Sequence, residues 1–112
     1  MTVEAQRTEV RLQYVTDCPN RHVAEERVRA ALAKVGQRDM TVVLECVVSA
    51  EVAAQLAFCG SPTVLVNGRD PFADPGGAVG LSCRRYLTED GMEGAPSVGQ
   101  LTAALCAIGD AP

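Results

Sequence analysis

Cys18 is the residue with the strongest case for chemistry in this 112-residue chain. It stands in the segment TDCPNRH, between an apolar run typical of a strand and an amphipathic helical pattern. A thiol at a helix N-terminus lies near unpaired backbone N–H groups and the positive end of the helix dipole, and both favour the nucleophilic thiolate. Arg21 and His22 can add positive charge, and Asp17 is a neighbouring acid or base. The pattern predicts a reactive thiol at Cys18, tuned by Asp17, Arg21 and His22.

The other four cysteines bear on what Cys18 can do. They are Cys46, Cys59, Cys83 and Cys106, and no two of the five cysteines form a Cys-x-x-Cys pair. This spacing excludes a dithiol motif and a zinc ribbon. Cys59 and Cys83 are the candidates for a second thiol near Cys18. Cys46 and Cys106 fit core positions, because free cysteine is often buried.

The composition of the chain limits which ligands and partners it can bind and in which cell compartment we expect it. The net charge of −4 and the absence of a basic patch argue against nucleic acid as a partner. No apolar run approaches the roughly 20 residues of a membrane helix, and the opening MTVEAQRTEV lacks the apolar stretch of a signal peptide. Cys18 and His22 offer two metal ligands where structural zinc requires four. We therefore expect a cytoplasmic protein with mostly reduced thiols, no membrane partner, no metal and no cofactor.

A β-α-β unit must position Cys18. Residues 10–15 alternate as a strand does, and the following helix is predicted to begin at Pro19 and to end near Gly36. Residues 40–48 are almost continuously apolar, which is typical of a strand covered on both faces. Such a unit crosses over right-handed with parallel strands. The predicted buried face of the helix comprises Ala24, Val28, Ala31, Leu32 and Val35.

The second half of the chain is predicted to complete the sheet. A helix over residues 49–58, which ends at Gly60, leads to a strand over residues 61–66, which closes in an Asn-Gly turn. A long loop over residues 69–82 then precedes a short fourth strand over residues 83–87 and a turn.

The last helix covers the sheet, over residues 97–109. We expect a single α/β domain over residues 1–112, with residues 1–9 as a flexible tail. Its predicted architecture is β-α-β-α-β-β-α, a mixed four-stranded sheet with helices on both faces. The predicted buried residues of the last helix are Leu101, Ala104, Leu105 and Ile108.

Three segments in this order resemble the thioredoxin-like family. VTDCPNR stands where the family has its Cys-x-x-Cys loop, GSPTVLVNG is similar to its cis-proline loop and following strand, and GAPSVGQLTAAL is similar to the segment that opens its last helix. The resemblance covers residues 10–108 and implies a cis peptide bond between Ser61 and Pro62. It also makes Ser61 and Pro62 substrate-binding residues, because the family's cis-proline loop faces the cysteine and presents backbone groups to an extended substrate.

The chain departs from this family at three places. Arg21 replaces the second cysteine of the motif, and Asp17 stands where tryptophan is usual. The segment 69–95 is longer than a tight hairpin needs. The usual dithiol cycle is therefore not available to this chain.

These observations leave three functions open. In the first, Cys18 performs monothiol thiol–disulfide exchange with a low-molecular-weight thiol or a protein thiol or disulfide, and a second thiol molecule, Cys59 or Cys83 resolves the mixed disulfide. In the second, clustered thiols handle a soft metal or an organomercurial, since small bacterial proteins of this type are sometimes grouped with alkylmercury lyases. In the third, a non-catalytic module holds an extended partner in the cis-proline groove.

Overall fold

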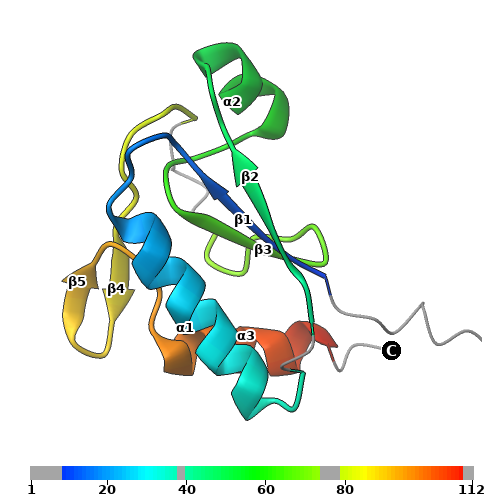
Figure 1. The fold of residues 1–112 in the computed structure, drawn as a ribbon. Helices are drawn as coiled ribbons and strands as arrows, with labels where there is room; N and C mark the ends of the chain where they lie inside the picture. The colour runs from blue at the N-terminus through cyan, green and yellow to red at the C-terminus, as the bar shows by residue number, and fades with distance from the viewer. Residues whose placement is uncertain (1–8, 38–39, 74–78, 110–112) are drawn as a thin grey trace, which may run out of the picture.

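The computed structural model describes residues 9–37, 40–73 and 79–109, and it has a mixed α/β architecture (Figure 1). Within these residues, three helices accompany a three-stranded sheet and a two-stranded sheet. The elements in chain order are β1 (Val10–Tyr14), α1 (Asn20–Lys34), β2 (Val42–Cys46), α2 (Ala50–Leu56), β3 (Thr63–Val66), β4 (Tyr86–Thr88), β5 (Gly91–Glu93) and α3 (Val98–Gly109).

The larger sheet has the strand order β2-β1-β3. The central strand β1 runs parallel to β2, with Tyr14 opposite Cys46, and antiparallel to β3, with Gln13 opposite Thr63. The helix α1 makes the connection between the two parallel strands. The carboxyl ends of β1 and β2 therefore meet at one edge of the sheet, where α1 begins.

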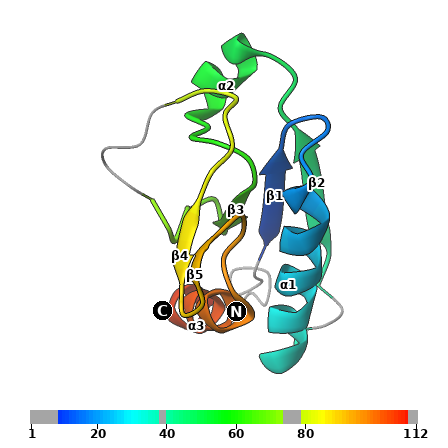
Figure 2. The ribbon, with the colours of Figure 1, turned by 90° about the vertical axis from the view of Figure 1, so that its left-hand side faces the viewer.

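The main core lies between this sheet and the pair α1 and α3. Four of the five residues predicted for the inner face of the first helix are buried, and the fifth, Val35, packs against them partly exposed. Leu101 and Leu105 of α3 are buried in the same core, as predicted, and Ala104 is partly buried. The side chain of Ile108 lies outside the described residues. The core residues of β1, β2 and β3 lie opposite one another or two residues apart in the sheet, so their side chains point to the same face. The helices α1 and α3 pack on these side chains and therefore cover the same face of the sheet (Figures 1 and 2).

The short helix α2 lies beyond the end of β2 (Figure 1). The hydroxyl of Ser49 caps it by accepting a hydrogen bond from the Val52 N–H at 3.2 Å. It ends earlier than predicted because Ala57 adopts a left-handed conformation with φ of 53°. Phe58 follows this helix and is buried in a second small cluster with Val47 and Ala53.

The expected fourth strand of the sheet is not found at residues 83–87. Instead, Cys83 forms an isolated parallel bridge with Ser61, and β4 begins only at Tyr86. The strand β4 pairs with β5, in a segment where only a turn was expected. In the described part of the chain the sheet is thus three-stranded, and the β4–β5 hairpin stands beside it (Figure 2).

Two predicted segments are described only in part. Of the predicted tail 1–9, only Glu9 is described, and residues 74–78 of the predicted loop 69–82 also lie outside the described residues. The described residues of that loop contain no helix or extended strand. No helix among the described residues is both long and apolar enough to cross a membrane.

Candidate functional site

Cys18 lies in the tight connection between β1 and α1. Its N–H donates to the Val15 carbonyl at 3.2 Å, and its own carbonyl accepts from the Arg21 N–H at 3.3 Å. Asp17 turns the chain with a positive φ of 68°. Pro19 is the N-cap of α1 rather than its first residue, so Cys18 directly precedes the cap. Cys18 is 8% exposed, so most of the residue is shielded from solvent.

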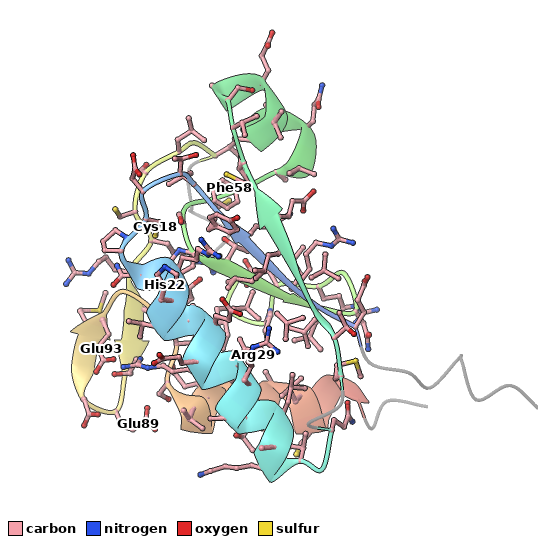
Figure 3. All side chains as sticks on the ribbon, in the orientation of Figure 1. Cys18, His22, Arg29, Phe58, Glu89 and Glu93 are labelled. Carbon is pink, nitrogen blue, oxygen red and sulfur yellow. The ribbon has the colours of Figure 1, made fainter. Side chains whose placement is uncertain are left out.

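A cavity of about 400 Å³ opens next to this turn, and we call it the Cys18 cavity. It lies at the carboxyl ends of β1 and β2 and at the beginning of α1, where Figure 3 labels Cys18 and His22. Ligand sites of α/β proteins commonly lie outside the carboxyl ends of parallel strands. The residues that line it are Tyr14, Val15, Thr16, Asp17, Cys18, Arg21, His22 and Cys46. The three proposed tuning residues therefore share a cavity with Cys18.

Cys46 is the member of this cavity that sequence reasoning missed. It was predicted to pack in the core, but it is partly exposed, and its sulfur lies 3.4 Å from Thr16 Oγ1. Since Cys46 ends β2 directly opposite Tyr14, the end of β1, parallel pairing brings it to the edge where Cys18 lies. The sequence did contain a signal for this placement, because Cys46 ends the second strand of the predicted parallel pair.

Arg21 is held against Tyr14. The central carbon of its guanidinium lies 4.6 Å from the centroid of the Tyr14 ring, a cation–π geometry. Its Nε atom is buried and has no hydrogen-bond partner among the described residues. By contrast, the side chains of Asp17 and His22 are exposed to solvent.

The Ser61–Pro62 peptide bond is cis, which confirms that expectation from the resemblance. Both residues are buried, and the Ser61 hydroxyl accepts a hydrogen bond from the Val15 N–H at 3.1 Å. Val15 begins the turn that ends at Cys18, so this hydrogen bond from Val15 to Ser61 helps to hold the turn in place.

The backbone groups of Ser61 are already occupied by the chain itself. Its N–H donates to the Ser82 carbonyl, and its carbonyl accepts from the Arg84 N–H, both at 2.9 Å. According to the family resemblance, these are the backbone groups that would bind an extended substrate. Gly60 keeps the two segments close, because a Cβ there would lie 3.0 Å from the Arg84 Cβ and 3.2 Å from the Ser82 carbonyl oxygen.

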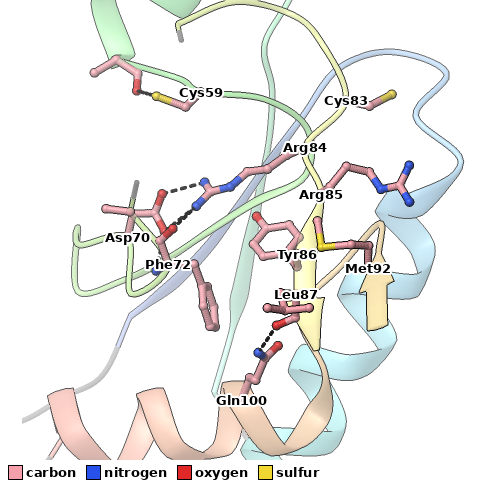
Figure 4. Close-up of a pocket in the computed structure, with 12 residues that line it drawn as sticks. Cys59, Asp70, Phe72, Cys83, Arg84, Arg85, Tyr86, Leu87, Met92 and Gln100 are labelled. Atoms are coloured by element: carbon pink, nitrogen blue, oxygen red, sulfur yellow. Dashed lines mark hydrogen bonds and ion pairs between the residues drawn. The ribbon is translucent and has the colours of Figure 1, made fainter. Parts of the chain in front are cut away.

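Cys59 and Cys83 line a different cavity, of about 710 Å³, which we call the Arg84 cavity (Figure 4). Figure 4 shows their sulfur atoms pointing in opposite directions, and the Cys59 thiol donates to the Ala57 carbonyl at 3.5 Å. Cys83 and Cys106 are exposed, so the core position predicted for Cys106 is wrong. Among the described residues, no group of three or more histidine, cysteine or acidic side chains is arranged to hold a metal ion.

An ion pair between Arg84 and Asp70 lines the Arg84 cavity. Arg84 bonds both carboxylate oxygens of Asp70, at 2.7 and 3.4 Å, as well as the Phe72 carbonyl and the Thr63 hydroxyl (Figure 4). Its guanidinium also lies 4.8 Å from the centre of the Tyr86 ring. Burial lowers the pKa of Arg84, but the hydrogen bond that Arg84 donates to Asp70 and the electrostatic effects of Tyr86, Asp70 and Cys59 together outweigh this, so the net pKa is raised. With its donors engaged, Arg84 connects the segment after β3 to β4 and is poorly available to a ligand.

The phenol of Tyr86 is expected to ionise at a higher pH than an ordinary tyrosine, because its pKa is raised. Its ring packs edge-on against Phe72, its hydroxyl donates to the Pro62 carbonyl, and burial raises its pKa above the ordinary value of about 10. Because the folded state favours the neutral phenol, this contribution to stability is fully present below about pH 10 and is lost as the pH rises further. We expect the tyrosinate absorbance of the wild type minus that of Tyr86→Phe to appear only together with loss of the far-ultraviolet circular dichroism. Ionisation of Tyr86 near pH 10 in a still folded protein would contradict this prediction.

A scan of protein-family models finds no match to this sequence, and searches of curated proteins and of solved structures likewise find none.

Proposed function

We propose that this chain is a thioredoxin-like protein that performs monothiol thiol–disulfide exchange through Cys18 on low-molecular-weight disulfides. The scaffold part of the proposal is supported by the strand order β2-β1-β3, with one parallel and one antiparallel neighbour, and by the cis bond before β3. In this proposal the β4–β5 hairpin stands where the family's fourth strand would extend the sheet.

The observation that carries the proposal is the setting of Cys18. The thiol directly precedes the N-cap of α1 and lines a cavity together with Arg21 and His22. The helix N-terminus and the guanidinium both favour negative charge on a sulfur at this position. A cysteine that served only to pack the core would need no cavity beside it.

The size and surroundings of the site favour a small substrate. A cavity of about 400 Å³ suits a small organic disulfide. An extended polypeptide would have to pair with Ser61, but the backbone N–H and carbonyl of Ser61 are bonded to Ser82 and Arg84. A protein substrate, or a partner held in the cis-proline groove, would first have to displace this segment.

The proposed reaction has two balanced steps. The Cys18 thiolate attacks one sulfur of a disulfide RS–SR′, forms Cys18–S–SR and releases R′S⁻, which takes up a proton from water. A second thiolate R″S⁻ then attacks the sulfur of the bound R group, forms RS–SR″ and releases the Cys18 thiolate. The net reaction converts RS–SR′ and R″S⁻ into RS–SR″ and R′S⁻, so the electrons come from R″S⁻ and the protein returns to its starting state without a cofactor.

The test is reduction of bis(hydroxyethyl) disulfide by excess glutathione, followed as formation of glutathione disulfide. We expect the wild type to accelerate the reaction and Cys18→Ser to reduce the rate to background, because the nucleophile is removed. The matched control is Cys106→Ser, which removes an exposed thiol on α3 and should leave the rate unchanged.

Other outcomes identify the other two functions. Equal rates for wild type and Cys18→Ser would disprove the proposal. Tight mercury(II) or copper(I) binding that is lost on replacing either Cys18 or Cys46 would favour soft-metal handling. If no thiol of the native protein reacts faster than Cys106, a non-catalytic binding module is favoured.

A further inference from the structure

We propose that Arg21 makes the Cys18 cavity selective for disulfides that carry a carboxylate close to the sulfur. This inference rests on the proposed function and names its substrate class. It gives Arg21 the role of an anchor that binds the substrate, in addition to any effect of its charge on the Cys18 sulfur.

Arg21 is fixed in place but has no anionic partner among the described residues. The guanidinium lies over the Tyr14 ring, and the buried Nε atom lacks a hydrogen-bond acceptor among these residues. The natural helical partner would be Glu25, four residues on, but Glu25 instead bonds Arg29 at 3.0 Å. The terminal nitrogens of Arg21 can therefore serve a ligand.

The charges around the cavity leave a positive balance next to Cys18. Among the residues that the structure describes, Asp17 is the only acidic one that lines the cavity, and its side chain is exposed, so water screens it. Arg21 is partly buried, where the effective dielectric is lower and the field of a charge is stronger. The beginning of α1 adds the positive end of a 15-residue helix, and an exposed His22 adds charge when it is protonated.

A carboxylate fits this arrangement better than a neutral or cationic group. The planar guanidinium binds carboxylates through parallel N–H donors, and such charge-assisted hydrogen bonds are about twice as strong as neutral ones. Since Arg21 and Cys18 line the same small cavity, the carboxylate must belong to the molecule whose sulfur reacts. The substrate class is thus a small anionic disulfide, such as that of a mercapto acid or a carboxylate-bearing thiol peptide.

The experiment compares three disulfides that share a short carbon arm and differ in charge: dithiodipropionate, bis(hydroxyethyl) disulfide and cystamine. Formation of mixed disulfides on the native protein is quenched at intervals and assigned to individual cysteines by peptide mapping. The rate at Cys18 is divided by the rate at the exposed Cys106, which cancels the intrinsic reactivity of each reagent. We expect this ratio to be about tenfold higher for the anionic disulfide than for the neutral one, and lowest for cystamine.

Arg21→Gln should remove this preference, and Arg21→Lys should restore part of it. The matched control is Arg85→Gln, since Arg85 is exposed and lines only the other cavity. If Arg21 acted only by activating the Cys18 thiolate, Arg21→Gln would slow all three reagents equally and the inference would be wrong. If that variant does not fold, the wild type still decides the question, because the preference must decline with added salt.

The two proposals fail in different ways. If Cys18 reacts with all three disulfides at charge-independent ratios, the inference about Arg21 fails and the proposed exchange function stands. If Cys18 forms no mixed disulfide with any of them, the proposed function itself fails.

Discussion

Replacing Phe58 with alanine is expected to lower the free energy of unfolding by about 3–5 kcal/mol, the usual cost of removing a buried phenylalanine. Phe58 is 1% exposed and is the largest side chain of the second cluster, with Val47 and Ala53. Its removal leaves a cavity between α2 and the segment that leads to the cis bond. Because small domains are stable by only about 5–15 kcal/mol, this one change would remove a large share of the total.

The matched control for Phe58→Ala is Leu56→Ala. Leu56 is an apolar residue at the end of the same helix, but it is 37% exposed, so its truncation should cost less than about 1 kcal/mol. Urea denaturation followed by circular dichroism measures both variants. Similar losses for the two variants would mean that Phe58 is not the anchor of this cluster. Val15 packs against the cluster, so we also expect faster alkylation of Cys18 in Phe58→Ala.

The second large effect is expected from Arg84→Met, which keeps the length of the side chain and removes its charge. The variant would leave the carboxylate of Asp70 without the partner that it bonds through both oxygens. The side chains are 10% and 21% exposed, so the orphaned charge is only partly solvated. We expect a loss of about 2–4 kcal/mol, somewhat below the full cost of breaking a completely buried pair.

Arg85→Met is the control for this effect, because Arg85 is the adjacent residue and is exposed. Its replacement should change stability by no more than about 0.5 kcal/mol. The double variant Arg84→Met with Asp70→Asn removes both charges and should be less destabilised than the sum of the two single variants. Strict additivity in this cycle, measured by urea denaturation, would show that the ion pair does not couple the two segments.

The sequence predicts most helices and strands because their patterns are local. The inner face of α1 follows from the spacing of Ala24, Val28, Ala31 and Leu32, and each of these residues is buried. Strand β1 and the pairing of β1 with β2 follow from alternation and from the β-α-β order. The strand β5 was missed, because its three residues, Gly91–Glu93, are stabilised by pairing with β4 rather than by a pattern of their own.

The candidate site was predictable only around Cys18. Asp17, Arg21 and His22 are within four residues of Cys18 along the chain, and all of them share its cavity. Cys46 joins this cavity through strand register, and Cys59 and Cys83 face another. A count of cysteines cannot distinguish these cases, because the three are all many residues from Cys18.

The sequence by itself therefore established a single thiol at the beginning of a helix, with no second cysteine in its motif and with positive charge in the first turn. These properties depend on neighbours along the chain, and local physical chemistry suffices to derive them. The three-dimensional fold was needed to learn that Cys46 shares the cavity of Cys18, and that residues 82–84 form hydrogen bonds with the backbone N–H and carbonyl of Ser61. Both facts are contacts between distant segments, which are set by packing and hydrogen bonding of the whole chain rather than by any local pattern.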